Sequence, residues 1–176
     1  MELNLKPGHV IHTLMEEHKL ILGFLDELEK TNQRIQEESK YDENNGDFKK
    51  MENIAEHLVG AEPHHQREEK VLFPEMEKRE IFGPTEMMRR EHEEFRPKKK
   101  EILSLGQSVA KMDFDKFKKN LKESADFLVA MLREHIAKEN DILYPMALEV
   151  IPEEAVWQNM KKECDKIGYC CFTPQA

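Results

Sequence analysis

The sequence of 176 residues contains few of the features that mark secreted, membrane-spanning or disulfide-stabilised proteins. It has three cysteines, Cys164, Cys170 and Cys171, and all three lie near the C-terminal end, so they do not form a disulfide framework. No apolar run is long enough to span a bilayer, and none at the N-terminus resembles a signal peptide. We therefore expect a soluble, cytoplasmic protein that has no membrane partner.

Basic clusters are also scarce. The chain carries 27 Lys and Arg against 36 Asp and Glu, a formal net charge of −9. The one basic run, Lys98-Lys99-Lys100, has acidic residues close by on both sides and is expected to form a solvated helix face. Because nucleic acids and anionic membranes attract positively charged surfaces, this balance excludes both as expected partners.

Glycine and proline are rare, with 7 and 8 residues, while charged residues make up 36% and hydrophobic residues 39%. This composition is typical of amphipathic helices, and apolar residues do recur at helical spacing along most of the chain. Four long helices are expected: from Thr13, or from just after Pro7, to about Glu37; from Asp47 to Glu80 with an interruption at Pro63; from an N-cap at Thr85; and from an N-cap at Asp113 to about Met146.

The fold class predicted from these helices is all-α, an up-down-up-down four-helix bundle. The bundle is expected to occupy residues 1–150 as one domain. Residues 151–176 are expected to form a tail that contains a short amphipathic helix after Pro152 and then the cysteines.

Two stretches, His64–Pro74 and His135–Pro145, share one pattern. In each, a His precedes a Glu by four residues, and the run ends in Leu, an aromatic residue and Pro. Residues i and i+4 lie one turn apart on the same helix face, so the imidazole and the carboxylate can converge on one point. One such pair would carry little weight, but its repetition with the same ending indicates a metal site.

The two other expected helices each add a His, in the pairs Glu17-His18 and Glu91-His92, so the chain shows a weak internal duplication. The apolar pattern directs these imidazoles inward, and burying several of them together with carboxylates is costly unless they have partners. The predicted metal ligands are four imidazoles and two carboxylates that can bridge two ions: His18, His64, His92, His135, Glu68 and Glu139. This donor set suits iron or manganese and leaves open positions for a small molecule.

These motifs resemble the hemerythrin HHE cation-binding family over roughly residues 9–150. The resemblance implies a four-helix bundle around a non-haem di-iron centre, in which manganese or zinc could substitute for the two iron ions. Two positions differ from the oxygen-carrying hemerythrins: Arg96 stands where those proteins place a second His on the third helix, and Glu139 stands where they use Asp.

The departures make the ligand set more similar to HHE proteins linked to iron-sulfur repair and to oxygen, nitric oxide or iron sensing. We therefore expect a protein that binds or reacts with O2, NO or peroxide, in sensing or in a stress response. The alternative is an iron store or donor for iron-sulfur cluster repair, with a protein partner that receives the iron and a cysteine tail that assists delivery.

One choice of ligands stays open in the second expected helix. The family resemblance, counted back from Leu72-Phe73-Pro74, selects His64 and Glu68. The apolar stripe of Met51 and Leu58, continued through Pro63, selects His65 and Glu69 instead. Because proline can shift the phase of a helix, we assign His64 and Glu68, and keep His65 and Glu69 as alternative or additional ligands or as groups that orient one.

Overall fold

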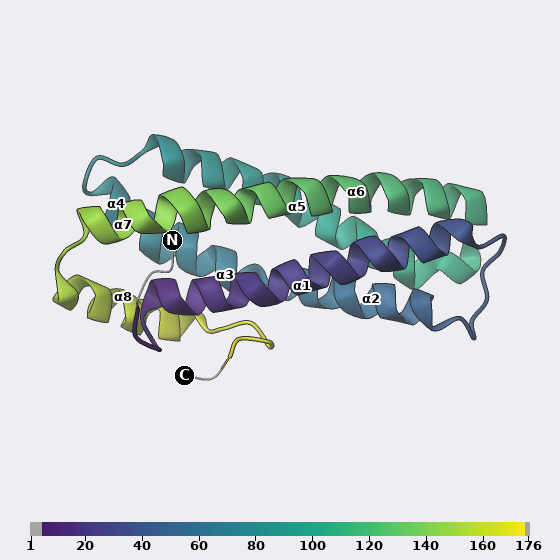
Figure 1. The fold of residues 1–176 in the computed structure, drawn as a ribbon, viewed down its shortest axis with the longest axis horizontal. Helices are drawn as coiled ribbons and strands as arrows, with labels where there is room; N and C mark the ends of the chain where they lie inside the picture. Colours follow the sequence, from purple (N-terminus) through teal and green to yellow (C-terminus); the bar gives the residue numbers. More distant parts are fainter. Residues whose placement is uncertain (1–4, 175–176) are drawn as a thin grey trace. The chain divides into compact units, whose positions relative to one another are not determined.

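The computed structural model describes residues 5–174, in which helices are present and β-strands are absent, so the all-α class is confirmed. Figure 1 shows the helices in chain order. The α-helices are α1 (Val10–Glu37), α2 (Gly46–Val59), α3 (Glu62–Arg67), α4 (Phe73–Glu77), α5 (Gly83–Ser108), α6 (Phe114–Lys138), α7 (Tyr144–Val150) and α8 (Glu154–Ile167). Two π-helices, η1 (Glu68–Leu72) and η3 (Glu139–Leu143), and one 3-10 turn, η2 (Val109–Lys111), link some of them.

Several expected helix starts can be compared with the structure. The start at Asp113 is confirmed, because its Oδ1 accepts a hydrogen bond from the Lys116 N–H at 2.9 Å, as an N-cap does. Thr85 is not an N-cap: α5 begins at Gly83, and the Thr85 hydroxyl donates to the Phe82 carbonyl at 2.9 Å. The first helix takes the earlier of its two expected starts, at Val10, after His9 accepts the Ile11 N–H through Nδ1 at 3.2 Å.

The expected helix from Asp47 to Glu80 is divided into four segments, α2, α3, η1 and α4. The first break lies at Gly60–Ala61, and Pro63 stands in the first turn of α3, where its missing N–H leaves no helical bond unmade. The helix is therefore interrupted just before Pro63, and α3 begins as a separate segment.

The two π-helices repeat at the same place in both sequence motifs. Each begins at the motif Glu and ends before an aromatic residue whose N–H bonds the carbonyl five residues back, Phe73 to Glu68 and Tyr144 to Glu139. Pro74 and Pro145 follow directly, and proline has no N–H for the usual bond four residues back and collides with that carbonyl. The widened turn relieves this conflict, and such π segments are frequent at functional sites.

The chain divides into two compact units. The first unit comprises the described residues up to Leu20, Gly60–His92 and those from Glu134 onward. Its core joins apolar side chains of α1, η1, α4, α5, η3 and α7 to Trp157, Met160 and Cys164 of α8. The helix expected in the tail is thus present, and its apolar face is buried in the same core as the sequence motifs.

The second unit comprises Ile21–Val59 and Glu93–Arg133. Phe48 of α2 packs edge-on against Phe114, with ring centroids 6.1 Å apart, and α2 also buries Met51, Ile54 and Leu58. Gly106 of α5 lies so close to α2 that an added Cβ would be 3.1 Å from the Met51 methyl group, so glycine permits this helix contact. Within residues 5–174, no helix has both the length and the apolarity required to cross a bilayer.

Candidate metal centre

The six predicted ligands lie together in the first unit, and each is at most 1% exposed. One group of ligand atoms that all lie within 4.8 Å of one another comes from His18, His64, Glu68 and Glu139. A second such group comes from His92, His135 and Glu139. The structure therefore brings together residues from α1, α3, η1, α5, α6 and η3, which are distant in the sequence.

The imidazole Nε2 atoms face the two carboxylates. Glu139 places Oε2 at 3.2 Å from His18 Nε2 and Oε1 at 3.0 Å from His135 Nε2. Glu68 Oε2 lies 3.5 Å from both His64 Nε2 and His92 Nε2. Each carboxylate thus reaches both groups of ligand atoms, which is the arrangement that bridging ligands require.

The separation of donors matches one coordination sphere. His92 Nε2 and His135 Nε2 are 3.0 Å apart. Two nitrogen donors that each lie about 2.1 Å from one ion are separated by about 3 Å when they occupy adjacent corners. Nitrogen and carboxylate donors without thiolates fit iron, manganese or zinc.

Every candidate imidazole has its outer nitrogen, Nδ1, bonded to a side chain from another segment. His18 Nδ1 lies 2.8 Å from Asn140 Oδ1, and His64 Nδ1 lies 2.6 Å from Glu17 Oε2. For the other two imidazoles, His92 Nδ1 lies 2.8 Å from Glu69 Oε1 and His135 Nδ1 lies 2.7 Å from Glu91 Oε2. Since these oxygens accept, Nδ1 carries the proton and Nε2 presents a lone pair to the cluster.

The outer bonds follow the internal duplication. Glu17 and Glu91, each directly before a ligand His, bond the imidazoles of His64 and His135. Glu69 and Asn140, each directly after a predicted ligand Glu, bond the imidazoles of His92 and His18, respectively. The bonds from Glu17 and Glu91 thus lie within one repeat of the duplication, whereas those from Glu69 and Asn140 join the two repeats.

A buried Arg holds Glu17 in place. Arg67, 1% exposed, donates from Nη2 to both Glu17 oxygens, at 2.6 and 2.7 Å. Residues of the segment after α8 contact this pair. The Thr173 hydroxyl donates to Glu17. The Tyr169 ring centroid lies 4.7 Å from the Arg67 guanidinium carbon, and Cys170 Sγ lies 3.9 Å from Arg67 Nη2. The Glu91 carboxylate is held instead by Lys138, which is 24% exposed.

Three carboxylate oxygens in the cluster have no hydrogen-bond partner among the described residues: Glu68 Oε2 and both Glu139 oxygens. The other Glu68 oxygen, Oε1, accepts a bond from the buried Tyr144 hydroxyl at 2.6 Å. Buried carboxylate oxygens without a donor are costly. A bound cation would satisfy all three, so the residues fit a metal.

When only protein groups are counted, several pKa values in the cluster lie far from their usual range. Burial and repulsion by Glu139 raise the pKa of Glu68 well above its usual range. Burial opposes the charge of Glu139, but attraction to His135 outweighs it and holds the pKa of Glu139 well below its usual range. Burial lowers the pKa of His64 to about 4, whereas for His135 the attraction of Glu139 and Glu91 overcomes burial and raises the pKa to about 9.

The alternative candidates, His65 and Glu69, lie beside the cluster. His65 is buried and stacks on His92, with ring centroids 4.0 Å apart and planes at 8°. Glu69 bonds the outer nitrogen of His92. The two groups of ligand atoms above include His64 and Glu68 and neither His65 nor Glu69, which instead contact the His92 ring.

Sequence reasoning missed the roles of Glu17, Glu91, Arg67 and Tyr144. A signal for the first two was visible, because a Glu directly precedes both His18 and His92. Arg67 and Lys138 also occupy equivalent positions, each three residues after a motif His. Tyr144 is the aromatic residue of the second motif ending, where the first motif has Phe73, which offers no hydroxyl.

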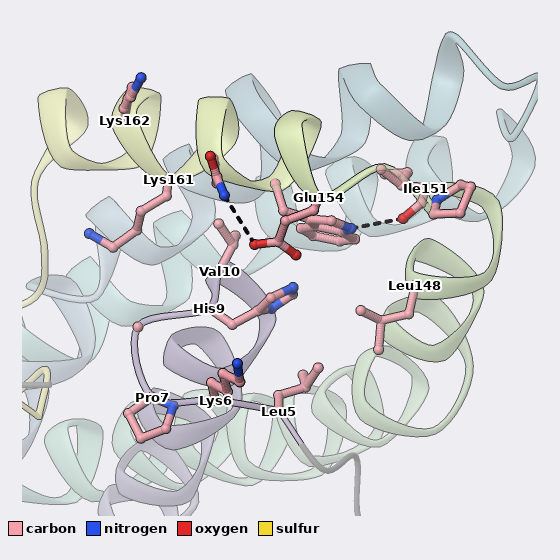
Figure 2. A pocket seen from close by; sticks show the side chains of 14 residues that line it. Leu5, Lys6, Pro7, His9, Val10, Leu148, Ile151, Glu154, Lys161 and Lys162 are labelled. Atoms are coloured by element: carbon pink, nitrogen blue, oxygen red, sulfur yellow. Dashed lines mark hydrogen bonds between the residues drawn. The ribbon is translucent and has the colours of Figure 1, made fainter.

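A hollow of about 750 Å3 in the first unit is separate from this cluster. Figure 2 shows side chains that line it, among them Leu5, Pro7 and His9 from the segment that precedes α1 and Glu154 and Lys161 from α8. Trp157, which also lines it, donates to the Ile151 carbonyl at 2.8 Å. His9 stacks there on Trp157, with centroids 4.6 Å apart. None of the six predicted ligands lines this hollow, so His9 belongs to a different surface from the metal candidates.

The cysteines differ in accessibility. Cys164 and Cys170 are buried, and burial raises the pKa of each thiol to about 11, while Cys171 is exposed. Because the thiolate is the reactive form, we expect one thiol per chain to react rapidly with a thiol reagent in the native protein and two to react only after unfolding. A Cys171→Ser variant should lose the rapid phase, whereas rapid reaction of all three thiols would contradict the buried placement.

The chain matches the model of a known protein family. The family model described as hemerythrin HHE cation binding domain matches residues 9–147. That range contains all six predicted ligands and their outer hydrogen-bond partners. A search of curated proteins finds no match to the chain.

Proposed function

Because the chain belongs to the hemerythrin HHE cation-binding domain family, we propose that it is a non-haem di-iron protein that binds or reacts with O2, NO or peroxide. Its role would be sensing or an oxidative or nitrosative stress response in the cytoplasm. The proposal includes the up-down-up-down topology of a four-helix bundle for residues 1–150, with residues 151–176 as a tail.

The observation that supports this function most directly is the ligand cluster itself. Four imidazoles with fixed Nδ1–H tautomers surround two carboxylates, three of whose oxygens accept no hydrogen bond within the described part of the chain. Four nitrogens and two carboxylates would not fill the coordination positions of two six-coordinate ions, so room would remain for a small ligand.

When iron is bound, it would supply redox chemistry and open positions for a diatomic ligand or peroxide. The residues of the chain would hold the ions, neutralise their charge and exclude water. His18, His64, His92 and His135 would hold the ions through Nε2, and Glu68 and Glu139 would neutralise their charge. Tyr144 fixes one oxygen of Glu68 and leaves the other to face the cluster. Near-complete burial of all six ligands keeps bulk water away.

The function is tested by purifying the protein anaerobically, measuring its metal content, and recording its absorption spectrum before and after exposure to air or NO. We expect about two irons per chain, because carboxylate-bridged sites in helical bundles hold two ions. We also expect new near-ultraviolet and visible absorption bands after exposure to air or NO. Protein that contains no metal, and takes up none when reconstituted with ferrous iron, would overturn the proposal.

Iron donation for iron-sulfur cluster repair is the alternative. In the structure, Cys164 and Cys170 are buried and only Cys171 is exposed, so the cysteines offer one accessible thiol for delivery. Transfer of iron to an apo-cluster protein, with sensitivity to Cys171→Ser, would favour this alternative over sensing.

A further inference from the structure

The segment that follows α8 reaches the surroundings of the ligand cluster from outside the range of the family match. The family model ends at residue 147, and α8 lies between that point and residues 168–174, the yellow trace after α8 in Figure 1. We call residues 168–174 the strap. Because the strap contacts both Glu17 and Arg67, a part of the chain beyond the matched domain touches the group that orients His64.

The Glu17 carboxylate joins the strap to the ligand cluster. Its Oε2 lies 2.6 Å from His64 Nδ1, and its Oε1 accepts a hydrogen bond from the Thr173 hydroxyl of the strap. Arg67 Nη2 donates to both oxygens. Since Glu17 is fully buried, water does not replace the Thr173 bond while the strap is in place. The position of the carboxylate, and with it that of the His64 ring, therefore depends on the strap.

The strap has the construction of a segment that opens locally. It leaves α8 at Gly168, whose φ of 92° favours glycine. It forms no helix, and the Thr173 N–H closes a turn by donating to the Cys170 carbonyl at 3.0 Å. Tyr169 and Cys171 are exposed, and a hollow of about 460 Å3 borders the strap. A non-helical, partly exposed segment opens at a lower free-energy cost than the packed helices beside it.

The second repeat of the duplication shows that the strap is specific to one imidazole. Glu91, which bonds His135, pairs with Lys138, and their side chains are 14% and 24% exposed. The equivalent side chains of Glu17 and Arg67 are 0% and 1% exposed. The pair that the strap contacts is thus sealed from solvent, whereas the equivalent pair is not.

We propose that the strap is a closure over the Glu17–Arg67 pair, and that its opening loosens His64 and lets iron exchange with solvent. The proposal rests on the metal site of the proposed function. When the strap opens, water competes for the hydrogen bonds of Glu17, and loss of such an outer partner weakens metal binding by about 10- to 100-fold. Because coupling between two sites is reciprocal, bound iron must hold the strap closed by the same factor.

The Cys170 thiol reports opening of the strap without any assay of activity. It is buried when the strap is closed, so it reacts with iodoacetamide only when the strap unfolds locally. In a Cys171→Ser parent protein, trypsin separates the Cys170 peptide from the Cys164 peptide by cleaving after Lys166. Cys164 is buried in the core of the first unit, so its alkylation marks unfolding that extends beyond the strap.

Thr173→Val removes the hydroxyl that bonds Glu17 and keeps the shape of the side chain. In metal-free protein, Cys170 should then be alkylated about 10-fold faster, the factor that a hydrogen bond to a charged group contributes. The alkylation rate of Cys164 should not change. Thr173→Ser restores the donor and should restore the parent rate. Thr13→Val is the control, because it makes the same change at another residue that lines the adjoining hollow, and it should leave both rates unchanged.

Loading with ferrous iron tests the coupling itself. Iron should slow the alkylation of Cys170 in the parent protein by about 10- to 100-fold. Thr173→Val should release iron to a ferrous chelator about 10-fold faster than the parent, and Thr13→Val should release it at the parent rate. An alkylation rate of Cys170 that iron leaves unchanged, or equal iron release from the two valine variants, would overturn the inference. Equal alkylation rates of Cys170 and Cys164 in the metal-free parent would also overturn it, because the strap would then not open separately.

The function and the inference fail in different ways. Two irons per chain, together with a Cys170 alkylation rate that iron does not change, would overturn the closure and leave the di-iron function intact. A single iron at saturation that still slows the alkylation of Cys170 would overturn the di-iron function and support the closure. Absence of any iron uptake would overturn both.

Discussion

Replacing Glu139 by glutamine is expected to lower the affinity for both ions by more than about 100-fold, beyond the range found for outer hydrogen-bond partners. Glu139 presents one oxygen to His18 and the other to His135, and neither accepts a hydrogen bond from the described residues. Glutamine keeps the side-chain volume but has no charge and only one oxygen, so it cannot bridge the two halves. The measurement is iron per chain after anaerobic reconstitution and desalting.

Glu123→Gln provides the control, because it makes the same chemical change on the exposed side of α6. That variant should bind iron as the wild type does. Far-ultraviolet circular dichroism of both metal-free variants would show that the helices remain. Two irons retained by Glu139→Gln after desalting would remove Glu139 from the ligand set.

Replacing Arg67 by methionine is expected to reduce the free energy of unfolding by about 3–5 kcal/mol, because it leaves a buried carboxylate without its partner. Glu17 is 0% exposed, and the Arg67 guanidinium supplies two of its hydrogen bonds. Methionine retains the apolar stem of the side chain, so the loss reports mainly the missing charge. Urea denaturation of the metal-free protein measures it.

The internal duplication supplies the matched control. Lys138 occupies the position equivalent to Arg67 and pairs with Glu91, but it is 24% exposed. Lys138→Met should cost less than about 1 kcal/mol, since solvent screens and replaces the pair. In the double variant Glu17→Gln/Arg67→Met, the uncompensated charge is gone, so the loss should be smaller than for Arg67→Met alone. Equal effects of Arg67→Met and Lys138→Met would contradict the difference in burial.

The helical phase of the first motif, His64–Pro74, could not be derived from the sequence alone. The stripe of Met51 and Leu58, extended straight on, selects His65 and Glu69. The chain instead breaks at Gly60–Ala61 and restarts with Pro63 in the first turn of α3, so that His64 and Glu68 face the cluster. Proline indicated that a phase change could occur, but its size depends on how the new helix packs.

The amino-acid sequence by itself determined the helical class, because its apolar residues recur at helical spacing, and the pairing of His with Glu, because that spacing places both on one helix face. Only the tertiary structure decided which residues support the ligands. Glu17, Glu91 and Asn140 look like ordinary polar helix residues until the helices pack and direct them at imidazoles elsewhere in the chain. For Glu69, which the sequence offered as a ligand or as an orienting group, the structure shows a bond to the outer nitrogen of His92. The burial of Arg67 likewise depends on the segment after α8, more than a hundred residues away, because hydrogen bonds and desolvation are set by neighbours in space.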